Sequence, residues 1–236
     1  GNDPATGREL LEIVSIKGHG YKGGPNENAL IEVSGRITPL DDTASADIRI
    51  TGQGIVSEPK LIDAMPPMTR KSVRNFDPIG NGKLPKFGGN FDCTVHRAYG
   101  RRQPWLVTTS LDIRDAVGGL KDFPYPMEGV NAQIVVHEDY LELTRAVMQR
   151  DEMSIELSGI VDWTTIDRKT HRAVVQPALT LKARGVPIDH ELLNALPEQK
   201  RAWLRRISLK GLLDIDGRIT AAAVGSDEGA VDLNTK

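Results

Sequence analysis

The stretch ALIEVSGRIT, at residues 29–38, decides the fold class that the sequence predicts. Its apolar residues Ile31, Val33 and Ile37 alternate with polar ones, and a period of two is typical of a β-strand with one buried side. Turn-forming residues follow at 41–45, and residues 47–56 resume a strand pattern. The two segments are therefore predicted to pair as a β-hairpin.

A second hairpin is predicted over residues 153–181, with a charged turn at 167–169. The spelling IELSG at 155–159 resembles IEVSG at 31–35. Duplication of one barrel element and chance similarity both remain open. A glycine inside a strand is typical of the bulges and bends that barrel corners require. The predicted fold class is mainly β, an OB-like barrel or barrels with a few short helices.

The expected helices lie at residues 137–149, at 189–196 after a capping Asp189, and from Pro197 to Ile207. After these helices we expect a strand pair, at residues 208–213 and 218–224, followed by a frayed tail. The predicted regions are an N-terminal hairpin region (1–59), a basic, aromatic, loop-rich segment (60–105), an OB-like core (106–185) and C-terminal helices with a strand pair (186–236). One compact domain spanning all four is the alternative.

Residues 60–105 carry nine basic and three acidic residues, in a chain whose formal net charge is −2. Five aromatic residues also fall in this segment. Positive charge that follows phosphates, interleaved with rings that stack on bases, is what single-stranded nucleic acid requires. The alternative is a surface loop whose rings pack inward and whose charges are solvated.

A resemblance to bacterial single-stranded-DNA-binding proteins covers residues 137–183. The matching residues are Arg150, Asp151, Ile155, Glu156, Gly159, Trp163, Asp167, Lys169, Val174, Val175, Leu179 and Leu181. The resemblance implies an OB barrel with a helix between its third and fourth strands and a long hairpin that reaches over the bound strand. It also implies that Trp163 stacks on a base. The family's acidic tail with an aromatic tip is absent from residues 225–236.

The function that we predict from these features is non-catalytic binding of single-stranded nucleic acid. Such a protein is expected to be cytoplasmic and homo-oligomeric, without a membrane partner. The alternative is a β-rich structural or adaptor subunit of a virion or secretion assembly. The predicted contact residues are Arg70, Lys71, Arg74, Lys86, Phe87, Phe91, Arg97, Tyr99, Arg101, Arg102, Trp105 and Trp163.

An enzyme is a weaker reading of the sequence. The five histidines have no metal-ligand spacing, and Cys93 is the chain's one cysteine, which excludes a disulfide framework. Two carboxylate pairs, Asp112 with Asp115 and Asp214 with Asp216, are of the kind that magnesium-dependent nucleases use. Closely spaced aspartates are also common in turns, so no catalytic residue, metal or cofactor is predicted. No apolar run approaches the length of about 20 residues that spans a bilayer.

Overall fold

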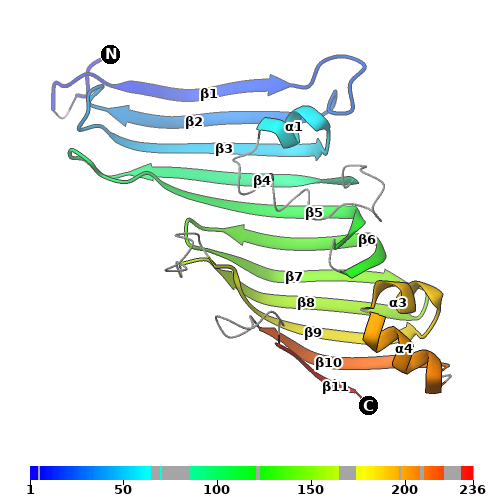
Figure 1. The fold of residues 1–236 in the computed structure, drawn as a ribbon. Helices are drawn as coiled ribbons and strands as arrows, with labels where there is room; N and C mark the ends of the chain where they lie inside the picture. Colours follow the sequence, from blue (N-terminus) through cyan, green and yellow to red (C-terminus); the bar gives the residue numbers. More distant parts are fainter. Residues whose placement is uncertain are drawn as a thin grey trace.

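The computed structural model describes residues 1–4, 6–64, 70, 86–120, 123–164, 174–196, 198–207, 210–220 and 230–235. Eleven strands form one antiparallel sheet, in which each strand pairs with its neighbours in sequence (Figure 1). The strands are β1 (Leu11–His19), β2 (Leu30–Thr38), β3 (Ser45–Val56), β4 (Lys86–Arg97), β5 (Leu106–Leu120), β6 (Phe123–Val136), β7 (Tyr140–Arg150), β8 (Met153–Asp162), β9 (Gln176–Pro187), β10 (Leu212–Thr220) and β11 (Ala230–Thr235). The helices are α1 (Pro59–Ala64), α3 (His190–Ala195) and α4 (Glu198–Ile207).

The sheet is open. β1 and β11 lie at its two opposite edges, and no pairing joins them among the described residues (Figure 1). The predicted mainly β class is therefore confirmed, whereas the predicted OB-like barrel is not, because a barrel requires its first and last strands to pair. Strands from all four predicted regions belong to this one sheet.

The helices gather at one end of the strands, which we call the helix end (Figure 1). The opposite end, where β2–β3, β4–β5, β6–β7 and β8–β9 turn, is the hairpin end. Asp189 caps α3 by accepting a hydrogen bond from the Leu192 N–H at 3.0 Å, as predicted.

The core lies under α3. Leu192 and Ala195 of the helix pack with a buried cluster from four neighbouring strands, β6 to β9, that includes Tyr125. Burial raises the pKa of the Tyr125 phenol. The buried sheet residues of the cluster are Tyr125, Met148, Met153, Ala183 and Val186.

Both predicted hairpins are confirmed, since β2 pairs with β3 and β8 with β9. Two other predictions were wrong. Residues 140–150 form strand β7 rather than part of a helix, and residues 212–220 form one continuous strand, β10, where a turn was expected. In β10 the alternation from Leu213 to Ile219 is intact, and its register shift against β9 comes from an extra residue between Ala183 and Val186 of β9. β7 itself contains a register shift near Thr144. A shift of this kind moves the apolar alternation by one residue and disguises a strand.

Candidate apolar binding face

The register separates the sheet into two faces of different chemistry. Directly paired residues of antiparallel strands point their side chains to the same face, so a row of partners can be followed across the sheet. One such row from β1 to β10 contains only apolar residues and glycine. Its members are Gly18, Ile31, Gly52, Phe91, Leu111, Ile134, Leu143, Gly159, Leu179 and Ile219.

The neighbouring row, one residue along each strand, points to the other face and is mixed. It contains Lys17, Glu32, Thr51, Asp92, Ser110, Val135, Glu142, Ile160, Ala178 and Thr220. We call the side that carries the first row the apolar face and the side that carries the second row the polar face. From β1 to β10, the polar residues among the described ones that pairing places directly on the apolar face are Arg97, Thr109 and Arg150.

Ion pairs between and within strands neutralise the charges of the polar face. Arg49 on β3 donates to Asp92 on β4, with an Nε–Oδ1 distance of 3.0 Å, and Arg184 on β9 pairs with Asp216 on β10 at 2.8 Å. Arg145 on β7 pairs with Glu156 on β8 at 3.3 Å. These charges are solvent-exposed, so the polar face is built to lie against water.

The apolar face is large. Eleven strands about 4.8 Å apart span about 50 Å across the sheet. Within β3, the face residues Ala46 and Ile55 are buried, whereas their neighbours Asp47 and Val56 are exposed. α3 covers this face at the helix end, because its contacts are Met148, Met153 and Ala183. Outside the part that α3 covers, the apolar face is wider than the apolar patches that ordinary soluble domains present.

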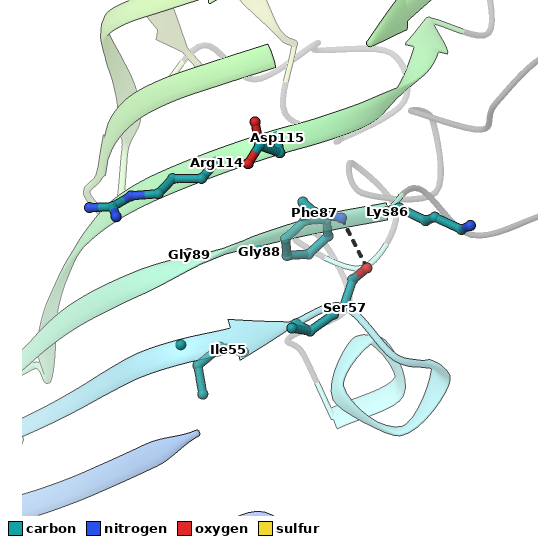
Figure 2. Close-up of a pocket in the computed structure, with 10 residues that line it drawn as sticks. Ile55, Ser57, Lys86, Phe87, Gly88, Gly89, Arg114 and Asp115 are labelled. Atoms are coloured by element: carbon teal, nitrogen blue, oxygen red, sulfur yellow. Dashed lines mark hydrogen bonds between the residues drawn. The ribbon is translucent and has the colours of Figure 1, made fainter. Parts of the chain in front are cut away.

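A hollow of about 530 Å³ opens at the helix end between β3, β4 and β5 (Figure 2). Gly54, Gly88 and Gly89 line it and contribute no side chains to fill it. The Phe87 backbone N–H donates to the Ser57 hydroxyl at 3.1 Å across the hollow, as Figure 2 shows. Phe87 and Ile55 supply its apolar lining.

Arg97 lies on the apolar face at the hairpin end of the sheet. It is paired with Ala46 on this face, and only 8% of its surface is exposed. Its guanidinium donates to four backbone carbonyls, those of Asp42, Ala44, Gly100 and Gln103. The Trp105 ring lies 5.5 Å from the Arg97 guanidinium carbon and is 48% exposed. Arg97 thus holds the two turns together, with four of its five N–H donors engaged by carbonyls.

The remaining predicted residues of the β4–β5 turn lie beside Arg97. Arg8 donates to the Tyr99 hydroxyl at 2.7 Å, and this hydrogen bond lowers the pKa of the Tyr99 phenol. Arg101 pairs with Asp42 at 3.2 Å. Arg102 is exposed, and no ion pair to it is found within the described part of the chain. We call Arg8, Arg97, Arg101 and Arg102 the cationic corner.

The other predicted contact residues are distributed elsewhere. Lys86 and Phe87 begin β4 at the helix end, about 35 Å from the β4–β5 turn at 3.3 Å per residue. Phe91 packs across Gly52 of the neighbouring strand, since a side chain at Gly52 would collide with its ring. Arg70 is half-buried, and Lys71 and Arg74 lie outside the described residues.

Trp163 lies at the hairpin end, three strands from the β4–β5 turn. Its indole N–H donates to the Glu138 carbonyl at 2.6 Å, and its backbone N–H donates to the Asp139 carbonyl at 3.0 Å. These two hydrogen bonds fix the half-buried ring against the β6–β7 turn. The structure therefore brings together Arg97, Tyr99, Arg101, Arg102 and Trp105, and leaves Trp163 apart from them.

Three of the four carboxylates considered for a nuclease have cationic or backbone partners. Asp112 pairs with Arg114 at 2.7 Å, and Asp216 pairs with Arg184. The Asp214 carboxylate accepts from the Gly185 N–H at 2.9 Å. Within the described residues, no group of three or more His, Cys, Asp or Glu side chains has the geometry of a metal site.

None of the helices in the described part of the chain is both long enough and apolar enough to cross a bilayer. Comparisons with family models, with curated proteins and with solved structures find no match. The resemblance to single-stranded-DNA-binding proteins therefore stays a prediction.

The apolar face is the feature that reasoning from the sequence missed. The alternating residues of each strand were visible, but their alignment on one side of a single sheet depends on the register of ten strand pairs. The sequence did contain one signal, the large number of alternating strands beside few predicted helices. With few helices to pack on it, one face of a sheet stays largely uncovered.

Proposed function

We propose that this protein binds the hydrocarbon chains of lipids along the apolar face of its sheet. The observation that carries the proposal is the row of ten paired positions, from Gly18 on β1 to Ile219 on β10, that contains no polar side chain. Burying apolar surface contributes roughly 25 cal/mol per Å². A ligand that covers even part of this face gains a large driving force.

The chemistry of the face favours hydrocarbon over a protein partner. Protein interfaces carry about one hydrogen bond per 100–200 Å², with polar groups distributed among apolar ones. From β1 to β10, the polar residues paired on the apolar face within the described residues are Arg97 near the hairpin end, Arg150 near the helix end and Thr109. Arg97 donates to four backbone carbonyls, and Arg150 pairs with Glu191 of α3. A hydrocarbon chain requires no hydrogen-bonding partner.

The helices also argue against a second sheet as the occupant. Two sheets pack face to face at a separation of about 10 Å, whereas α3 already lies on the apolar face over β6 to β10. An approaching flat sheet would meet this helix before it met the face. A narrow, flexible chain can lie beside the helix.

A matched pair of substitutions on β6 tests the proposal. Ile134 points to the apolar face and Val135 to the polar face, and both are half-buried. With a fluorescent long-chain fatty acid as the probe, Ile134→Asn is expected to weaken binding about tenfold, because it places an amide among the hydrocarbon groups. Val135→Asn is expected to leave binding within about twofold, and circular dichroism checks that both variants fold. Equal effects of the two variants, or no binding by the unmodified protein, would contradict lipid binding.

Single-stranded nucleic acid is the second candidate ligand, and exposed rings and cations at the hairpin end support it. Tyr99 and Trp105 are about half exposed, and Arg101 and Arg102 lie between them in the chain. Within the described residues such a site would be short, because ion pairs engage Arg49, Arg145 and Arg184 of the polar face. Oligo-dT binding that falls steeply with salt, and that weakens in the Arg101→Ala/Arg102→Ala variant, would support it.

Assembly into a larger structure, the adaptor alternative, is supported by the edge strand β1. Leu11, Val14 and Ile16 on this strand are 43%, 84% and 59% exposed. An exposed apolar edge is a template for pairing with another strand. We propose that homo-oligomers, where they form, use this edge, and Val14→Lys is expected to shift the protein to monomer in analytical ultracentrifugation.

A further inference from the structure

We infer that the cationic corner binds the anionic headgroup of the lipid whose chains lie on the apolar face, so that the protein prefers anionic to zwitterionic lipids. This inference rests on the proposed function and names the ligand class. It combines three observations: the position of the corner, its charge and the acidic character of the β6–β7 turn.

The corner is continuous with the apolar face. Arg97 points to that face from the last residue of β4, and the half-exposed Trp105 ring lies against its guanidinium. An indole with one apolar side and one polar edge is suited to the boundary between hydrocarbon and headgroup. A lipid chain that follows the face to its hairpin end therefore brings its headgroup to this turn.

The corner has an excess of positive charge. Its four guanidinium groups face two carboxylates, those of Asp41 and Asp42. Hydrogen bonds from Thr43 lower the pKa of Asp41 and favour its ionised form. Arg97 donates to four backbone carbonyls, Arg8 donates to the Tyr99 hydroxyl, and Arg102 has no ion pair within the described residues.

The described residues of the β6–β7 turn have the opposite charge. Glu138 and Asp139 form this turn, and Asp162 at the end of β8 lies in the neighbouring strand. A hydrogen bond from Thr164 lowers the pKa of Asp162 and keeps it ionised. An anionic headgroup is repelled from these three carboxylates and attracted to the β4–β5 turn.

The test compares two lipids that differ only in the headgroup, dioctanoylphosphatidylglycerol and dioctanoylphosphatidylcholine, below their micelle concentrations. The unmodified protein is expected to bind the anionic lipid more tightly than the zwitterionic lipid, by about fivefold for each unpaired cation near the headgroup. Arg102→Gln is expected to reduce the preference about fivefold, and Arg102→Lys to retain it. Arg218→Gln removes an exposed cation from the polar face and is expected to leave the preference unchanged.

Each outcome has a distinct meaning. Equal binding of both lipids by the unmodified protein, or a preference that survives Arg102→Gln, would overturn the headgroup assignment while leaving lipid binding intact. Binding of neither lipid would overturn the proposed function as well. The bound anionic lipid is also challenged with inorganic phosphate, with oligo-dT or with a chain-matched lipid. Displacement by phosphate or oligo-dT, but not by the chain-matched lipid, would show that the corner binds phosphates independently of the apolar face. That result would also overturn the inference.

Discussion

Arg97 and Arg102 show how the position of an arginine in the sheet determines whether it joins turns together or contributes surface charge. In sequence it is one of nine basic residues in the segment 60–105. In the structure it is buried, and its hydrogen bonds join the β2–β3 turn to the β4–β5 turn. Arg102, five residues along the chain, is exposed and contributes charge without holding structure.

This contrast gives a prediction about stability. Arg97→Met leaves four carbonyls without their donor, and the loss is expected to be about 3 kcal/mol, since hydrogen bonds to charged groups contribute roughly 1.5–3 kcal/mol each and some carbonyls will recover water. For a chain of this size that lowers Tm by about 6–12 °C. Arg102→Met, the matched control, is expected to change Tm by no more than about 1 °C.

Differential scanning calorimetry measures both variants. An unchanged Tm in Arg97→Met would show that Arg97 does not join the turns. Equal losses in the two variants would show that the turn as a whole, rather than the buried guanidinium, carries the stability.

At the scale of strands, β7 shows where prediction from the sequence failed. Leu141 and Leu143 point to the apolar face, and after the shift at Thr144 so do Ala146 and Met148. A helix was predicted because Tyr140, Leu143 and Val147 recur at a helical spacing. In the strand, Leu143 points to the apolar face, whereas Tyr140 and Val147 point to the polar face. Hairpins without such a shift, β2–β3 and β8–β9, were predicted correctly from their alternation.

The pairing of β3 with β4 gives a prediction about pH. The hydrogen bond from Arg49, followed by its charge, lowers the pKa of Asp92. A lowered carboxyl pKa stabilises the folded state above the ordinary value of about 3.9, and this contribution is lost as the pH falls through the folded-state pKa. Asp92→Asn is therefore expected to lower Tm slightly at pH 7, by no more than about 3 °C, because the pair is exposed.

The same comparison in acid supplies the control. As the pH falls through the lowered pKa of Asp92, the carboxylate of the unmodified protein takes up a proton, so the Tm values of the two proteins are expected to converge. A difference that stays constant or grows as the pH falls would contradict the assigned role of the pair.

At the scale of the whole molecule, the sheet is a single amphipathic layer. Its mainly β character, its hairpins and its capped C-terminal helices follow from local patterns such as the alternation at residues 29–38 and the Asp189 cap. The open edges of the sheet do not follow from local patterns. Closure depends on whether β1 pairs with β11, and no local residue pattern determines that pairing. For the same reason the apolar face emerges only when the register aligns Ile31, Leu111 and Leu179 on one side.

The chain's one cysteine provides the most direct test of this face. Cys93 lies near the middle of β4 and pairs with Ile50 and Thr109 on the apolar face, whereas the next residue, Thr94, points to the polar face. The measurement is the rate at which a water-soluble thiol reagent modifies Cys93 with and without dioctanoylphosphatidylglycerol, compared with the C93S/T94C variant. At lipid ten times above its Kd, the rate at Cys93 is expected to fall to about one tenth, because only the lipid-free fraction reacts. The thiol at position 94 is expected to react at an unchanged rate. Equal protection of both thiols, or of neither, would contradict the binding of lipid chains along the apolar face.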